Sequence, residues 1–256
     1  MGAALALFLS RCERDADRSA APAEPSAPWP ARPEKSATRR SRPVVYRVTE
    51  RSRVDFDAGT RSLPIRGTFP IVDGRFTLDF DHPSRSRGSA RIDVGAATLE
   101  GDAGARDPAR VSEALNWLDL GSSRPEAERE RLRFASFELE EIDVELSQDI
   151  TPAGSEAGAE EVRRATFVAR GALRLHDRRA TETVRGAASL HYDGRDAARP
   201  TRIVVTTSQP TLLELETFDV APRDAHGVLL AKELARVGRD IARHAKVALE
   251  LELVPE

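Results

Sequence analysis

Apolar and polar residues alternate along residues 44–81, and this alternation constrains the fold more than any other feature of the chain. Successive side chains of a β-strand point to opposite faces of a sheet, so the pattern predicts strands with one apolar face. It is interrupted at residues 57–59, 63–64 and 73–74, where glycine, proline and aspartate favour turns. The last break, Asp73-Gly74, stands between two apolar alternations and predicts a β-hairpin.

Further alternating segments raise the prediction to about eight to ten strands. A change of parity between Phe134 and Phe137 predicts a β-bulge near Ala135-Ser136. Residues 148–161, rich in small and acidic residues, predict a long hairpin loop. Short antiparallel strands avoid exposed edges by closing on themselves, so we expect an all-β fold, an antiparallel barrel. The further segments are residues 89–94, 131–146, 164–176, 181–192, 202–207 and 247–254.

Residues 107–118 change from a period of two to a helical period. Asp107 is a candidate N-cap, and Pro108 takes the first helical position, where proline is favoured. Apolar residues then recur at spacings of four and three, which places them on one face of a helix. The sequence therefore predicts a short inserted helix with Val111, Leu115 and Leu118 on its apolar face.

Residues 224–244 predict a longer amphipathic helix before the last strand, about five turns in length. Three interpretations are open: a lid or plug on the barrel, a helix lying on a membrane surface, or an element that binds a partner. The apolar stripe is narrow and lacks large aromatic residues, which favours packing against the barrel. The stripe consists of Leu230, Leu234, Val237 and Ile241.

The composition excludes several partners. The net charge of −3 arises from nearly balanced acidic and basic residues, so no charged field indicates nucleic acid. Aromatic residues make up only 5% of the chain, too few for stacking on bases. No internal apolar run approaches the roughly 20 residues that cross a bilayer. A membrane would be reached only through an anchor at the N-terminus.

Residues 1–12 form a short apolar segment that ends at Cys12, the only cysteine of the chain. Leu9-Ser10-Arg11-Cys12 resembles the site at which bacterial lipoprotein signal peptides are cut and lipidated, although Arg11 replaces a small residue and no basic region precedes it. Residues 13–43 predict a disordered linker rich in proline, alanine and arginine. Residues 44–256 then form the folded domain. We expect lipidation at Cys12 and a periplasmic or outer-membrane-anchored protein; secretion without an anchor and an incidental free thiol are the alternatives.

No motif indicates catalysis, a cofactor or a metal. A nucleophile elbow, a phosphate-binding loop, a zinc-protease motif and a dinucleotide fingerprint are all missing from the sequence. A zinc site needs three or four converging ligands, and the histidines do not pair at a metal-ligand spacing. We therefore predict a protein that is not an enzyme. The histidines are His82, His176, His191, His226 and His244.

The order of short motifs resembles the YceI-like family of periplasmic, lipocalin-like barrels, which bind polyisoprenoids or similar lipids. The resemblance implies an antiparallel barrel of about eight strands and an apolar lipid as partner. The sequence departs from the family pattern at His176, where glycine is usual, and near residues 57–59 and 109–110, where a histidine is often found. The motifs are Tyr46-Arg47-Val48, residues 52–56, 67–69, 74–79 and 92–94, Arg106-Asp107, residues 118–120, 134–136 and 171–176, and Glu182-Thr183-Val184.

We expect the barrel to bind an elongated lipid, a polyisoprenoid or a fatty-acyl chain, by burial and without catalysis. Arg106 is a candidate contact for a polar ligand head at the barrel mouth; alternatively it pairs locally beside Asp107, which caps the helix. The competing hypothesis is a solid barrel that acts as a structural or interaction module. Whether the protein forms a homodimer stays open, because no motif decides it. The predicted lining is Val54, Phe56, Phe69, Phe76, Leu78, Phe80, Ile92, Val94, Phe134, Leu173 and Leu175.

Overall fold

The structure, a computed structural model, describes residues 42–58, 65–99, 108–146, 161–193, 199–236 and 242–256. These residues belong to one compact unit of the chain, Arg40–Glu256. The predicted signal segment with Cys12, most of the predicted linker and the predicted contact Arg106 lie outside this part of the chain. The predicted loop at residues 148–161 lies outside it too, except for Glu161.

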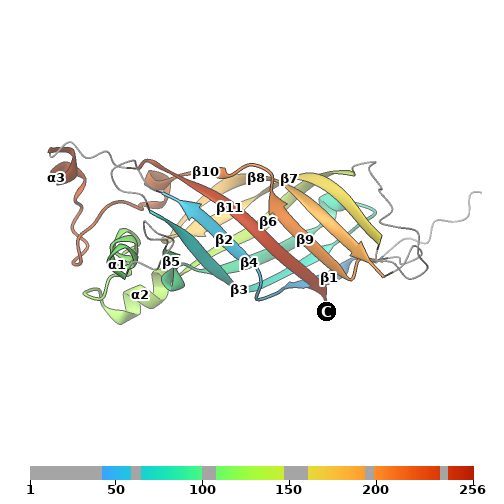
Figure 1. Cartoon of the computed structure of the whole chain (residues 1–256), viewed down its shortest axis with the longest axis horizontal. Coiled ribbons are helices and arrows are strands. Elements are labelled where there is room, and N and C mark those ends of the chain that lie inside the picture. Colours follow the sequence, from blue (N-terminus) through green and yellow to red (C-terminus); the bar gives the residue numbers. More distant parts are fainter. Residues whose placement is uncertain (1–41, 59–64, 100–107, 147–160, 194–198, 237–241) are drawn as a thin grey trace, which may run out of the picture. The chain divides into compact units, whose positions relative to one another are not determined.

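Strands dominate the described residues, and every pairing between them is antiparallel (Figure 1). They form one sheet in which neighbours along the chain mostly lie side by side. The strands are β1 (Val44–Val48), β2 (Arg53–Asp57), β3 (Arg66–Leu78), β4 (Arg87–Asp93), β5 (Thr98–Leu99), β6 (Phe134–Leu146), β7 (Glu161–Leu175), β8 (Arg178–Tyr192), β9 (Arg202–Thr207), β10 (Thr211–Glu214) and β11 (His244–Pro255).

The sheet closes into a ring of eight positions because β11 pairs with β2 on one side and with β9 on the other. Three positions are shared by two strands each. Both β1 and β2 lie between β3 and β11, both β4 and β5 pair with β3, and both β9 and β10 pair with β11. The prediction of an all-β, antiparallel barrel of about eight strands is confirmed.

The hairpin predicted at Asp73-Gly74 is wrong, because β3 runs through it without a turn. The pairing of β3 with β4 shifts register between Ile71 and Asp73, so the break in alternation is an irregularity within a strand. Gly74 serves a close approach instead: a Cβ atom there would lie 2.4 Å from Cγ2 of Val48. The Asp73-Gly74 pair inside β3 therefore marks a close contact with β1 rather than a turn.

The bulge predicted near Ala135-Ser136 is also misplaced. Leu132 belongs to a helix, α2 (Glu126–Leu132), so its parity with Phe134 carries no information about a strand. The register of β6 against β7 shifts between Leu139 and Glu141 instead.

The inserted helix is confirmed as α1 (Pro108–Trp117). Short 3₁₀ helices, η1 (Pro83–Arg85), η2 (Val94–Ala96) and η3 (Leu215–Phe218), join strands. A helix does precede the last strand, but the extent predicted for it is wrong: α3 covers Ala231–Arg236, and His244 already begins β11.

A turn replaces the first part of that predicted helix. One carboxylate oxygen of Asp224 accepts hydrogen bonds from the backbone N–H groups of His226 and Val228. Gly227 takes a φ of 83°, which a helix cannot contain. Leu230 therefore precedes α3, while Val237 and Ile241 lie outside the described residues.

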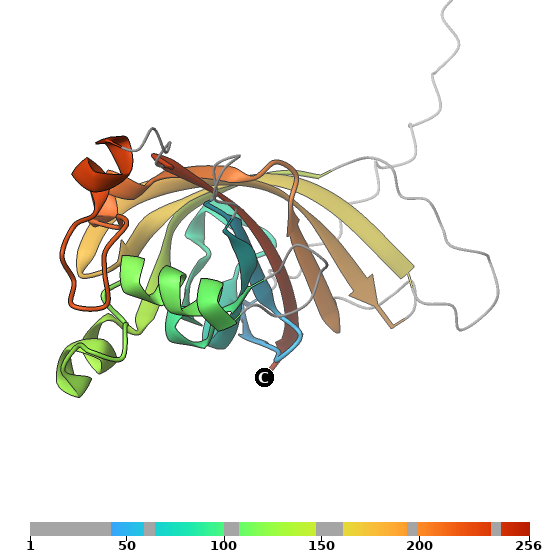
Figure 2. The same ribbon diagram turned by 60° about the vertical axis from the view of Figure 1, so that its left-hand side comes forward.

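The α-helices gather at one end of the barrel, and α1 lies across that end (Figures 1 and 2). An apolar cluster fills this helix-capped end; Leu99, Trp117 and Phe218 are its largest well-buried members. The opposite end, where the 3₁₀ helix η1 joins β3 to β4, has no α-helix in the described residues and is called the helix-free end below. A second cluster, which includes Tyr46, Phe76 and Leu251, extends toward the helix-free end. No helix in the described part of the chain is long and apolar enough to cross a membrane.

Candidate functional site

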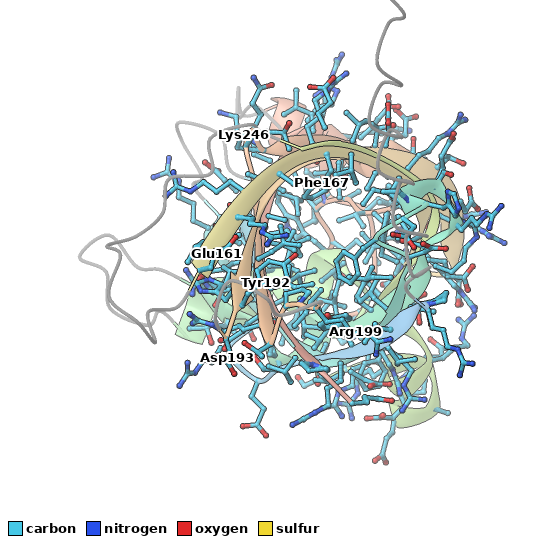
Figure 3. The ribbon with its side chains drawn as sticks, turned by 90° about the vertical axis from the view of Figure 1, so that its right-hand side faces the viewer. Glu161, Phe167, Tyr192, Asp193, Arg199 and Lys246 are labelled. Carbon is cyan, nitrogen blue, oxygen red and sulfur yellow. The ribbon has the colours of Figure 1, made fainter. Side chains whose placement is uncertain are left out.

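A cavity of about 470 Å³ occupies the barrel interior. Its wall comes from the inward-facing residues of all eight ring positions and is almost entirely apolar. A volume of this size is typical of sites for small ligands, which span about 300–1,000 Å³. Figure 3 looks along the barrel from the helix-free end, with Phe167 in the wall and Tyr192 near that end.

A smaller cavity of about 130 Å³ lies toward α1 and is lined by residues of both the barrel and the helix, including Phe56, Trp117 and Leu118. The two cavities adjoin, because five residues line both of them. The smaller cavity thus lies next to the larger one, on the side of the helix-capped end. The shared residues are Val54, Ile92, Leu173, Leu213 and Val247.

Two aromatic rings of the larger cavity lie against glycines of neighbouring strands. A Cβ atom on Gly171 would lie 2.5 Å from Cζ of Phe137, and one on Gly186 would lie 2.5 Å from Cζ of Phe167. Both glycines therefore make room for an aromatic lining residue. The sequence analysis missed these two phenylalanines. The apolar alternation of β7 was the available signal for Phe167, and the shared parity of Phe137 and Leu139 in β6 was the signal for Phe137.

Ten of the predicted lining residues do line a cavity. Whether they contact a ligand stays a prediction. Phe76, Leu78 and Phe80 line the larger cavity only; Phe56, Phe69, Val94 and Leu175 line the smaller one only; Val54, Ile92 and Leu173 line both. The rings of Phe56 and Phe69 stack with their centroids 4.1 Å apart.

Phe134 does not line either cavity, so that prediction is wrong. It pairs across the sheet with Asp93, while the next residue of β6, Ala135, lines the smaller cavity. The guanidinium carbon of Arg91 lies 3.5 Å from the centre of the Phe134 ring, and Arg133 lies 5.1 Å from it. The ring thus forms cation–π contacts on the outer face of the barrel. Arg106 lies outside the described residues, so its predicted contact stays a prediction.

Tyr46 closes part of the helix-free end. Its hydroxyl donates a hydrogen bond to the carbonyl oxygen of Pro200 at 3.0 Å, and both residues are buried. Burial, the largest cause, raises the pKa of Tyr46 to about 12 because the phenolate would lose its hydration. The ring meets that of Phe80 edge to face, with centroids 6.1 Å apart. Burial also raises the pKa of Tyr192, whose ring lies under Arg163.

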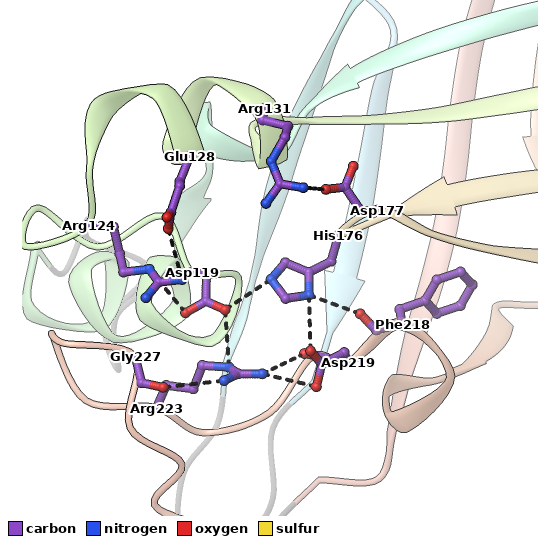
Figure 4. A network of polar contacts seen from close by, with 10 residues as sticks. All are labelled: Asp119, Arg124, Glu128, Arg131, His176, Asp177, Phe218, Asp219, Arg223 and Gly227. Carbon is purple, nitrogen blue, oxygen red and sulfur yellow. Dashed lines mark hydrogen bonds and ion pairs between the residues drawn. The ribbon is translucent and has the colours of Figure 1, made fainter.

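A polar network of Asp119, Arg124, His176, Asp219 and Arg223 lies at the helix-capped end (Figure 4). The nearest atoms of His176 and Asp119 are 3.2 Å apart, and Nδ1 of His176 lies 3.2 Å from the carbonyl oxygen of Phe218. Arg223 contacts both acids, at 3.5 Å from Asp119 and 3.0 Å from Asp219. The network thus joins the segment after α1, the β7–β8 turn and the end of η3.

Backbone strain concentrates in this network. Among the described residues, the non-glycine positions with positive φ are Asp119, His176, Asp177 and Asp219, with φ between 50° and 59°. His176 and Asp177 form the whole two-residue turn between β7 and β8, a turn that needs positive φ at both positions. Glycine, which is usual at this position in the family that the sequence resembles, would adopt a positive φ without strain. Histidine instead supplies a buried ring to the network.

No protein-family model matches the chain, and no curated protein matches it. Two solved structures are similar to it over most of both chains. A polyisoprenoid-binding domain from Saccharophagus degradans, implicated in plant cell wall breakdown, shares 13% identity over 83% of this chain and 99% of its own, with a TM-score of 0.45. BcnA from Burkholderia cenocepacia shares 14% identity over 79% of this chain and 96% of its own, with a TM-score of 0.47. The assignment of the barrel rests on the strand pairing described above.

Proposed function

We propose that the protein binds an elongated apolar lipid inside its barrel and acts by burial, without catalysis. The observation that carries the proposal is the apolar cavity of about 470 Å³, with a second apolar cavity of about 130 Å³ beside it toward α1. Each methylene group that leaves water contributes about 0.8 kcal/mol, so a long chain needs few polar contacts to bind. A polyisoprenoid, which the sequence resemblance implies, and a fatty-acyl chain both fit this chemistry.

The cavity is an argument against the competing solid-barrel module, which requires a filled interior. Catalysis finds little support in the polar network at the helix-capped end. The side chains of Asp119 and His176 are only 8% and 5% exposed, so a substrate could not reach them. Their neighbours in the network are arginines and a further aspartate, and none of these is a nucleophile of the serine or cysteine kind.

We place this binding function in the bacterial cell envelope. The support is the apolar segment that ends at Cys12 and the proline-rich stretch after it. Metabolic labelling with a fatty acid tests it: lipidation of the full chain should be lost in Cys12→Ala, whereas equal labelling of both proteins would remove the anchor.

Native mass spectrometry of the full chain, purified gently from bacterial envelopes and followed by organic extraction, tests lipid binding. We expect a co-purifying lipid of defined mass. An apo mass, with no uptake of added isoprenoid alcohols or fatty acids, would favour the solid module.

A pair of variants connects that result to the cavity. Ala169 lines the larger cavity, and Arg170, the next residue of β7, is exposed. Ala169→Phe should reduce the bound lipid because the ring fills the cavity, whereas Arg170→Phe should leave it unchanged. Equal lipid in both variants would place the lipid elsewhere.

A further inference from the structure

Glu182 is a carboxylate in the apolar wall of the larger cavity. It lies on β8, where alternate residues face the barrel interior, and Val184, Ala188 and Leu190 of the same face line the cavity with it. The side chain is half-buried, while Thr181 and Thr183 beside it are exposed. Glu182 therefore faces inward rather than belonging to the wet face of the strand.

No residue in the described part of the chain forms a hydrogen bond or an ion pair with the Glu182 side chain. Burial raises the pKa of this carboxyl, because the charged form loses part of its hydration. An unpaired carboxylate in an apolar wall is unfavourable, and a leucine would line the cavity at lower cost. The carboxylate thus adds something other than packing to the empty barrel.

The rest of the polar lining does not offer a second site of this kind. Asp79 and Asp81 also border the cavity. The Oδ1 atom of Asp79 accepts hydrogen bonds from the backbone N–H groups of Asp81 and His82, and Asp81 is an exposed residue of the same turn. Among the described residues, no lysine, arginine or histidine lines the cavity. The wall therefore presents an acceptor for hydrogen bonds and no cation to an anionic ligand.

Glu182 lies on a stretch of β8 that pairs with a strand on one side only. From Arg178 to Arg185, β8 pairs with β7 but not, in the described residues, with a strand on its other side; pairing with β9 begins at Gly186. Two contacts flank this stretch. The backbone N–H of Ser208 donates a hydrogen bond to the carbonyl oxygen of Arg185, and Nδ1 of His176 contacts the carbonyl oxygen of Phe218. Thr211 and Leu213 of β10, which shares a ring position with β9, line the cavity as well.

We propose that Glu182 binds the head of the lipid and selects a long-chain amine or alcohol over a fatty acid or a lipid phosphate. An ammonium or hydroxyl group can donate a hydrogen bond to the carboxylate, whereas an anionic head would lie beside a like charge with no cation in the wall. The apolar chain then extends along Phe137 and Phe167. This inference rests on the proposed lipid-binding function and names the ligand class of that site.

The test uses the delipidated full chain and three probes with the same chain: hexadecylamine, hexadecanol and palmitate. Affinities come from displacement of a fluorescent lipid at neutral pH. We expect the wild type to bind the amine and the alcohol at least about tenfold more tightly than the acid. Glu182→Gln should remove the preference for the amine and strengthen palmitate binding. Glu141→Gln, at an exposed position of β6, is the matched control and should change neither.

The outcomes separate the two proposals. Equal binding of all three probes by the wild type, unchanged in Glu182→Gln, overturns the head-group selection and leaves lipid binding intact. Tighter binding of palmitate than of the amine overturns it as well. If the wild type binds none of the probes, lipid binding and head-group selection fail together. Circular dichroism of each variant confirms that the barrel is folded.

Discussion

The two ends of the barrel are built from the same alternating strands, yet one is largely filled, with a cavity of about 130 Å³, and the other is hollow. At the helix-capped end, Trp117 and Phe218 complete a packed cluster, and a polar network ties three connections together. Toward the helix-free end, inward residues such as Ala165, Ala169 and Ala188 leave about 470 Å³ empty. Alternation decides which side chains face inward, whereas their size and the segments that cover the ends decide whether a cavity remains.

The largest difference should appear when buried phenylalanines are truncated in the delipidated protein. Phe218, 0% exposed, lies in the filled end, and Phe76, 8% exposed, borders the larger cavity. Phe218→Ala should destabilise the fold by about 3–5 kcal/mol, because it creates a new cavity. Phe76→Ala should cost about 1.5–3 kcal/mol, since its ring already lacks contacts on one side. Urea denaturation measures both; equal losses would mean that the two ends are packed alike.

The second-largest loss of stability should follow from removing the buried His176 ring from the polar network. His176→Ala leaves buried Asp119 and the carbonyl oxygen of Phe218 with fewer partners and should cost about 1–3 kcal/mol. His176→Gly is the matched control, because glycine adopts the φ of 50° without strain and should be about 1 kcal/mol more stable than the alanine variant. If both variants unfold at the wild-type urea concentration, the network does not stabilise this end.

Replacing an alanine with phenylalanine at each end tests the same difference in packing. Ala169 lines the larger cavity and Ala114 the smaller one, beside Trp117. Ala114→Phe should cost about 1–3 kcal/mol through overpacking, because the cavity of about 130 Å³ beside it offers much less room than the larger one. Ala169→Phe should change stability by less than about 1 kcal/mol, or raise it slightly, because the ring enters an existing space. Thermal melts of the delipidated proteins give the ranking, and a larger loss for Ala169→Phe would contradict the assignment of the hollow half.

The smallest effect at neutral pH concerns Tyr46 at the helix-free end. Tyr46→Phe removes the hydrogen bond to Pro200 and should cost about 0.5–1.5 kcal/mol. The pKa of Tyr46 is raised from 10.0 to about 12, so the folded state holds this proton more tightly than the unfolded state does. Its contribution is fully present below pH 10 and is lost as the pH rises toward about 12.

The chain offers a direct measurement of that loss, because Tyr46 and Tyr192 are its only tyrosines. Ultraviolet titration of the wild type should show ionisation above the ordinary tyrosine range, coupled to unfolding. The Tyr46→Phe variant should lose stability less steeply between pH 10 and about 12. An ordinary pKa for both tyrosines in the folded protein would mean that this end is open to water.

The sequence predicts the barrel and part of its lining because a period of two depends only on neighbours in the chain. Ten lining residues follow from it. Phe134 does not, because Leu132 before it is helical and the bulge lies at a later residue of β6. The predicted hairpin at Asp73-Gly74 failed for a related reason: glycine serves close approach as well as turns.

The two polar features could not be predicted in the same way. The network joins Asp119, His176 and Asp219 from separate parts of the chain, and only the fold brings them together. Glu182 stands in a strand among outward-facing threonines and arginines, so its inward direction depends on the register of β8. Neither the network nor Glu182 follows from the alternation of apolar and polar residues, because both consist of polar residues that the fold turns inward.

The shared ring positions also determine when the barrel can form. β11 pairs with β1, β2, β9 and β10, so it closes the ring at both of its neighbours. Ser52 and Glu252, which share two hydrogen bonds, are 200 residues apart in the chain. During synthesis, β1 and β2 therefore cannot pair with β11 until it has been made. Until then the other strands form an open sheet with two unpaired edges. Such long-range pairing slows folding, so closure by β11 should be the rate-limiting step.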